Sequence, residues 1–276
     1  MGAVAYDPKV VTIWEGFRDW LRAQDVDFDF VLYSNYERQV VDLVEGRLDA
    51  AWNSPLAWVR ARRLAAAGGV DVEALTMRDT DRDLRSAIIT RAGELDDAAA
   101  LRGGTVATGA VDSPQATLLP LSHLRCLGLE PGRDFTVRRF DVGVGLHGDH
   151  VGGERDAARA LVAGEVDAAC VIDANLQVFA QEGTLPAGTT RLLTHTAPFD
   201  HCNMTVRGNG PSTARLGEAL RSMSYGDPQV RPLLDLEGLH EWVDGRVDHY
   251  GALERAVDES GFYDAEGDVR ADDYRP

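Results

Sequence analysis

Hydrophobic and polar positions along the chain follow two alternating periodicities. Apolar residues recur at intervals of three and four across 10–21, which predicts an amphipathic helix, and polar and apolar residues alternate across 27–33, which predicts a strand. Strands that alternate with helices favour an α/β fold with parallel pairings. Further strands are predicted at 3–6, 48–52, 72–77, 85–90, 105–108, 135–140, 166–172 and 191–196, and further helices at 36–45, 56–67, 115–124, 154–162 and beyond 211.

One nine-residue segment recurs in the two halves of the chain. Leu43–Ala51 and Leu161–Ala169 are identical at six of nine positions and lie 118 residues apart. Each has the pattern of a helix end, a glycine and an apolar strand that leads into a polar loop. Chance similarity of two ordinary turns is one interpretation. We prefer two lobes of similar topology whose strand ends face a shared cleft, because ligands of open α/β sheets bind there.

The lobe boundaries follow from the predicted elements. The first lobe is predicted to comprise residues 1–92 and 200–276, with the strand at 85–90 as its last before the chain crosses over. The second lobe is predicted to comprise residues 93–199. The acidic residues from Ala265 onward are expected to be frayed.

The charge and composition of the chain narrow its partners and its compartment. Forty-five acidic against 28 basic residues give a net charge of −17, which argues against nucleic acid and against an anionic membrane surface. No 18-residue apolar run predicts a membrane span. Three widely spaced cysteines favour a reducing compartment, and the pattern of the first residues predicts no signal peptide. We expect a cytoplasmic protein, or an extracytoplasmic one if a leader has been removed.

Two clusters of side chains have the chemistry of metal ligands. If both face the cleft, they would supply imidazole, carboxylate or thiolate to a borderline divalent metal such as Zn²⁺ or Fe²⁺. The alternative is a polar, partly exposed turn and a structural histidine at the hinge, and no cofactor is firmly implied. The clusters are His147, Asp149, His150 and Glu154 in one turn and Asp200, His201 and Cys202 at the return crossing; the metal candidates are His147, His150, His201 and Glu154.

Cys202 beside His201 also suggests a nucleophile and its base. Adjacent residues on a strand point to opposite faces, which argues against that pair. Tyr6 and Tyr36 fall at a strand end and a helix start, where lining the cleft and packing in the core are equally expected.

Several short motifs occur in the order found in a known family. They are Tyr-Glu-Arg (36–38), Gly-Arg-Leu-Asp-Ala-Ala-Trp-Asn-Ser-Pro-Leu-Ala-Trp-Val-Arg-Ala (46–61), Leu-Arg-Gly-Gly-Thr-Val-Ala (101–107), the Asp-Ser loop at 112–113, the His-containing turn and Gly-Glu-Val-Asp-Ala-Ala (164–169). Over residues 3–250 the sequence resembles the phosphonate/phosphite-type substrate-binding proteins of ABC transporters. The resemblance implies a type II periplasmic-binding-protein fold, two α/β lobes that close on a small anionic ligand, and an ABC permease as partner.

The resemblance also implies which residues bind the ligand. Ser54 corresponds to the first-lobe loop that faces the ligand, and Asp173 to an acidic residue that accepts a ligand proton. Hydroxyls and helix N-terminal amides are suitable donors for phosphonate oxygens. The remaining matches are Ser113, Gln115 and Thr117 in a hydroxyl-rich loop and His147 or His150 in the turn, and His201 on the crossing strand is expected within reach of the ligand.

A second hypothesis is a cytosolic enzyme built on the same fold. A cleft that closes and expels water suits lyase, decarboxylase or hydrolase chemistry. His147 or His150 would be its general acid or base, because histidine titrates near neutrality. His201 and Cys202 are further catalytic candidates.

Overall fold

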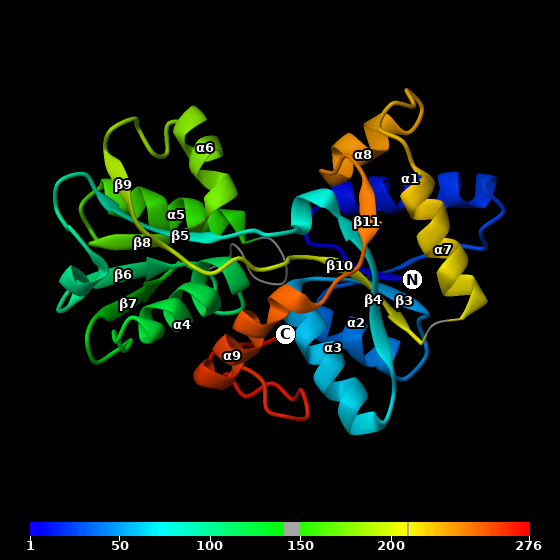
Figure 1. The fold of residues 1–276 in the computed structure, drawn as a ribbon, viewed down its shortest axis with the longest axis horizontal. Coiled ribbons are helices and arrows are strands. Elements are labelled where there is room, and N and C mark those ends of the chain that lie inside the picture. The colour runs from blue at the N-terminus through cyan, green and yellow to red at the C-terminus, as the bar shows by residue number, and fades with distance from the viewer. Residues whose placement is uncertain (141–149, 209) are drawn as a thin grey trace.

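The computed structural model describes residues 1–140, 150–208 and 210–276, and folds into two α/β lobes, each built on one sheet (Figure 1). The first sheet has the strand order β11-β4-β10-β3-β1-β2. Strand β1 runs parallel to β2 and β3, and β10 runs antiparallel to β3 and β4. The strands are β1 (Gly2–Val4), β2 (Val31–Tyr33), β3 (Ala50–Asn53), β4 (Val72–Arg78), β10 (Asn203–Arg207) and β11 (Trp242–Asp244).

The second sheet has the order β7-β6-β8-β5-β9. Strand β6 runs parallel to β7 and β8, and β5 runs antiparallel to both of its neighbours. The mixed α/β expectation is therefore confirmed. The strands are β5 (Ser86–Arg91), β6 (Thr105–Thr108), β7 (Thr136–Arg139), β8 (Ala168–Ile172) and β9 (Thr190–His195).

Helices cover both faces of each sheet, because each helix turns one apolar stripe inward. In the first lobe α1, α7 and α8 pack on one face, and α2 and α3 on the other. In the second lobe α5 and α6 lie opposite α4. None of the helices in the described part of the chain has the length and hydrophobicity that a bilayer crossing requires. The helices are α1 (Lys9–Ala23), α2 (Tyr36–Val44), α3 (Pro55–Gly68), α4 (Leu119–Cys126), α5 (Val151–Val162), α6 (Asp173–Gln181), α7 (Pro211–Ser222), α8 (Arg231–Glu237) and α9 (Gly251–Ser260).

The two copies of the repeated segment occupy equivalent places. Each runs from the end of a helix, α2 or α5, into a strand at the interior of its sheet, β3 or β8. The glycines between them, Gly46 and Gly164, have φ of 78° and 76°. This left-handed conformation is one that glycine adopts at little cost, so both helices end in the same way.

Two crossover segments, 79–85 and 196–202, join the lobes and pair with each other. Leu84 and Phe199 exchange two backbone hydrogen bonds of 2.9 and 2.8 Å, and His201 N donates to Asp81 O at 2.8 Å. The expectation that strand 85–90 belongs to the first lobe is wrong, since β5 lies inside the second sheet. An apolar strand of this kind fits either sheet, and only its pairing with β8 and β9 decides between them.

The C-terminal region packs against both lobes. A cluster of buried apolar residues joins α9 to α3 of the first lobe and to α4 and β8 of the second. Tyr263 and Tyr274 each donate a hydroxyl hydrogen bond to Glu37 Oε1, at 2.9 and 3.0 Å. The segment expected to be frayed is therefore docked, because Tyr274 is 3% exposed and contributes to this cluster.

The buried Tyr263–Glu37 hydrogen bond gives a stability prediction. Tyr263→Phe should lower the free energy of unfolding by about 1–2 kcal/mol, because it removes a buried donor from a carboxylate. Urea denaturation measures the change. Tyr225→Phe is the control, since Tyr225 bonds to an exposed Asp235 and its loss should cost below about 0.5 kcal/mol. Equal losses in the two variants would contradict the docking of the C-terminal segment.

Candidate functional site

A cavity of about 70 Å³ lies at the hinge between the two lobes. Its size suits a group of a few heavy atoms rather than a nucleotide. A larger groove lies elsewhere, between β7 and residues 260–273, but it lacks the cluster of charged hinge residues. The small cavity is lined by Tyr6, Tyr36, Trp52, Ser54, Pro55, Arg78, Pro114, His150, His201 and Cys202.

Two of the first-lobe lining residues follow the carboxyl ends of the parallel strands β1 and β3. Tyr6 follows β1, and Ser54 follows β3 at the start of α3. Ser54 Oγ accepts a hydrogen bond of 3.2 Å from Ala57 N, so the side chain also caps the helix. Tyr6, Tyr36 and Ser54, which were among the predicted binding residues, all line this cavity.

The predicted second-lobe loop lies behind the cavity, and only Pro114 of this loop lines it. Ser113 Oγ accepts from Ala116 N at 3.1 Å, and Thr117 Oγ1 donates to Ala110 O at 2.7 Å. Both hydroxyls therefore hold the loop in shape. Gln115 Nε2 donates to Glu154 at 3.2 Å, while its buried Oε1 has no hydrogen-bond partner in the described part of the chain.

The other predicted second-lobe residues are spread out. His150 is buried and lines the cavity, with its Nδ1 4.0 Å from Asp112 Oδ1. Asp173 lies outside the lining and pairs with His195 Nε2 at 3.0 Å. Glu154 is buried, and its carboxylate accepts from Gln115, the Ile172 amide and Asn175, while burial raises its pKa. His147 lies outside the described residues.

Arg78, which is partly buried, and the buried Asp81 form an ion pair at the hinge that the sequence pattern did not reveal. Arg78 Nε and Nη2 donate to the two oxygens of Asp81 at 2.6 and 2.8 Å. Burial opposes the charged form of Asp81, but Arg78 outweighs it and lowers the pKa of that carboxyl to about 2. Because Arg78 ends β4 and Asp81 follows it, locating the first crossover correctly would have drawn attention to them.

His201 lies next to this ion pair. Its Nδ1 is 3.5 Å from Asp81 Oδ1 and 3.1 Å from Cys202 Sγ. Burial alone would lower the pKa of His201, but Cys202 and the Asp81 carboxylate raise it to about 10. The ring therefore carries a positive charge at neutral pH and, with Arg78, brings cationic side chains to a cavity in an acidic protein.

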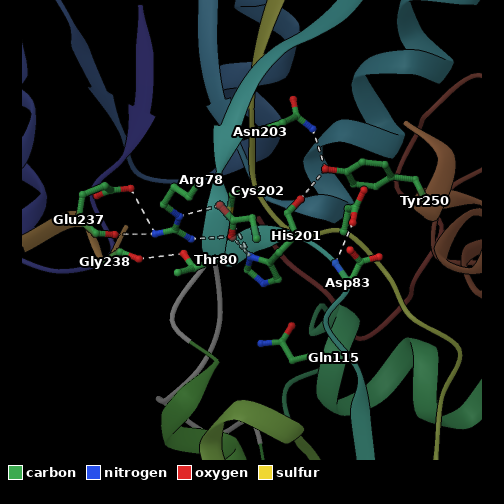
Figure 2. Close-up of polar contacts among 12 residues, drawn as sticks. Arg78, Thr80, Asp83, Gln115, His201, Cys202, Asn203, Glu237, Gly238 and Tyr250 are labelled. Carbon is green, nitrogen blue, oxygen red and sulfur yellow. Dashed lines mark hydrogen bonds and ion pairs between the residues drawn. The ribbon is translucent and has the colours of Figure 1, made fainter. Parts of the chain in front are cut away.

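His201 and Cys202 do not face opposite ways, contrary to the expectation for adjacent residues of a strand. Both line the cavity, and their side chains touch (Figure 2). The strand rule does not apply to them because β10 begins only at Asn203. The backbone here is held by Tyr250, whose hydroxyl donates to His201 O at 2.6 Å and accepts from Asn203 Nδ2 at 2.9 Å.

The predicted set of metal candidates is not brought together among the described residues. Glu154 belongs to the second-lobe network, and His150 and His201 occur in no common ligand cluster there. Residues 1–140, 150–208 and 210–276 instead contain two clusters with converging ligand atoms. These are Asp81 with His201 and Cys202, and Asp83 with Asp200 and His249.

Two solved structures of similar fold contain a small bound molecule or ion. The PhnD1 protein of Prochlorococcus marinus in complex with methylphosphonate has a TM-score of 0.67 and 16% identity, over 94% of this chain and 96% of that one. XAC2383 of Xanthomonas citri, bound to chloride ion, has a TM-score of 0.69 and 19% identity over the same shares. These likenesses show the two-lobed periplasmic-binding-protein fold. No curated protein matches the chain in sequence.

The family match covers most of the chain and supports ligand binding rather than the enzyme alternative. Residues 3–250 match the phosphonate periplasmic substrate-binding proteins of ABC transporters. The two lobes, the paired crossovers and the small hinge cavity fit this match. The chain belongs to this family of phosphonate substrate-binding proteins.

Proposed function

We propose that the protein binds a small oxyanion, phosphonate- or phosphate-like or a carboxylate, in the hinge cavity. The observation that carries the proposal is that His201 and Arg78 both line a cavity of about 70 Å³, where the pKa of His201 is raised to about 10. A guanidinium and an imidazolium are the side chains that bind such oxygens by charge-assisted hydrogen bonds. The complex of a structural neighbour with methylphosphonate supports this ligand class.

The protein would release its ligand to an ABC permease outside the cytoplasm. This part of the proposal rests on the family, whose members are periplasmic components of ABC transporters. The ligand would bring Pro114 and His150 of the second lobe against the first-lobe residues, so that occupancy and lobe closure are coupled.

An anion titration of His201→Gln tests the proposed function. For the wild type, isothermal titration with methylphosphonate, phosphite, phosphate and acetate should identify at least one ligand. His201→Gln should weaken its binding by about tenfold or more, because a hydrogen bond to a charged partner is worth roughly 1.5–3 kcal/mol. The titrations are run in EDTA, so that no metal contributes.

The matched control for this titration is His240→Gln. His240 pairs with Asp79 on the surface and does not line the cavity. The affinity of the His240→Gln protein for the anion should equal that of the wild type. An anion that binds all three proteins equally would contradict the assignment to the hinge, and failure of every anion to bind would contradict the proposed function.

Glu237 sits behind the cavity and links Arg78 to α8. Arg78 Nη1 donates to Glu237 O at 2.8 Å and approaches its Oε1 at 3.3 Å (Figure 2). Burial raises the pKa of Glu237 to about 7, against the opposing effect of Arg78. Folding therefore favours the protonated acid, and its contribution to stability is complete below the unfolded pKa of about 4.3 and lost as pH rises through about 7.

Glu237→Gln should flatten this pH dependence. Between about pH 4.5 and pH 8 the wild type should lose roughly 3 kcal/mol more unfolding free energy than the variant, since glutamine has no proton to lose. Urea denaturation across this range measures the difference. Glu241→Gln, an exposed neighbour, should run parallel to the wild type. A Glu237→Gln curve that also runs parallel would show that Glu237 is charged in the folded protein throughout.

A further inference from the structure

Three different metal-ligand atoms converge on one point at the hinge. His201 Nδ1 lies 3.1 Å from Cys202 Sγ and 3.5 Å from Asp81 Oδ1, and all three atoms lie within 4.8 Å of one another. Asp81 and Cys202 are 2% and 7% exposed. The atoms come from both crossover segments, which the backbone hydrogen bond from His201 to Asp81 holds together.

These separations fit the ligand shell of a zinc ion. Zinc binds imidazole, carboxylate and thiolate at about 2.0–2.3 Å, so neighbouring ligands of a tetrahedral site lie roughly 3.3–3.8 Å apart. The observed distances from Nδ1 to Sγ and to Oδ1 require shifts of only a few tenths of an ångström. Mixed nitrogen, sulfur and oxygen ligands suit this borderline cation better than calcium or magnesium, which prefer oxygen.

Arg78 is compatible with a metal at this point. It binds both oxygens of Asp81, but each carboxylate oxygen has two lone pairs, and Oδ1 faces Nδ1 as well as the guanidinium. Metal-bound carboxylates are commonly held by such an outer hydrogen-bond partner, which fixes their orientation. Arg78 would therefore orient Asp81 while the thiolate and the carboxylate balance the charge of the ion.

In the second cluster, Asp83 with Asp200 and His249, a guanidinium takes the place that a metal would need. Arg246 already lies among these side chains, with hydrogen bonds to both oxygens of Asp200 and an ion pair to Asp83 at 2.8 Å. Asp83 is more than half exposed, and no sulfur ligand is present. The cluster is a hinge ion network that a guanidinium completes.

We propose that Asp81 Oδ1, His201 Nδ1 and Cys202 Sγ bind a zinc ion, whose fourth position opens into the hinge cavity. The zinc ion takes the place of the proton on His201 Nδ1 and supplies the positive charge there instead. His201 and Cys202 line that cavity, so an oxygen of the bound anion completes the zinc coordination. Only this fourth ligand rests on the proposed function; the three protein ligands do not. Zinc and anion therefore strengthen each other's binding, by an equal factor of about tenfold.

A cobalt substitution tests the three protein ligands directly. Full-length protein without a histidine tag is stripped with EDTA and titrated with Zn²⁺ and Co²⁺ alone. One equivalent should bind, and the cobalt form should show the near-ultraviolet charge-transfer band of a metal–thiolate bond. Cys202→Ser should lose this band and bind zinc at least about a hundredfold more weakly, since even outer partners of a ligand are worth tenfold to a hundredfold.

Cys126→Ser is the matched control, because Cys126 is an exposed cysteine remote from the hinge cavity. It should keep the band and the affinity of the wild type. Asp81→Asn, which should bind zinc more weakly, provides a second test if Cys202→Ser fails to fold. A wild type that binds no equivalent of zinc, or a band that survives in Cys202→Ser, would overturn the proposal.

Methylphosphonate titrations with and without zinc separate the two proposals. Tenfold tighter binding with zinc supports the open fourth position. Anion binding that zinc leaves unchanged overturns that position and leaves the proposed function standing. If the protein binds zinc but none of the anions, the three metal ligands are supported and the proposed anion-binding function is contradicted.

Discussion

The pairing of the two crossover segments is the constraint on which the hinge cavity depends. Leu84 and Phe199 exchange backbone hydrogen bonds, and the amide of His201, two residues after Phe199, donates to Asp81 O. This short ladder fixes the residues that leave β4 next to those that enter β10. Residues more than a hundred positions apart in the sequence therefore share one cavity.

A buried charge network gives this hinge its chemistry. The chain has a net charge of −17, so a cavity for an anion needs local positive charge against the surrounding field. Arg78 supplies one cation, and its bidentate pairing with Asp81 offsets part of the cost of burying both groups. Asp81 and Cys202 in turn keep His201 protonated. One carboxylate thus orients both cations toward the cavity.

Much of the fold and part of the site could be predicted from the sequence. Periodicity predicted most of the elements, and the repeated segment predicted two similar lobes, because both depend on local pattern. Strand β11 was missed, since it lies in the region beyond 211 that was predicted to be helical. The lobe of β5 could not be predicted in this way, since its partners β8 and β9 lie far along the chain. The docking of Tyr274 on Glu37 was also missed, because the polar composition of the C-terminal segment does not reveal a single buried side chain.

The site residues also divide into those that local pattern predicts and those that depend on long-range contacts. Tyr6, Tyr36 and Ser54 lie at strand ends and helix starts, which local pattern predicts, and all three line the cavity. Arg78 and Asp81 could not be predicted in this way, because their place at the cavity depends on how the two crossover segments pair.

A crystal structure of the protein soaked with methylphosphonate tests the central claim most directly. The account predicts phosphonate density in the hinge cavity, with an oxygen within hydrogen-bond distance of His201 or Arg78. Density confined to the groove beside Arg138 and Arg139 on β7 would contradict it.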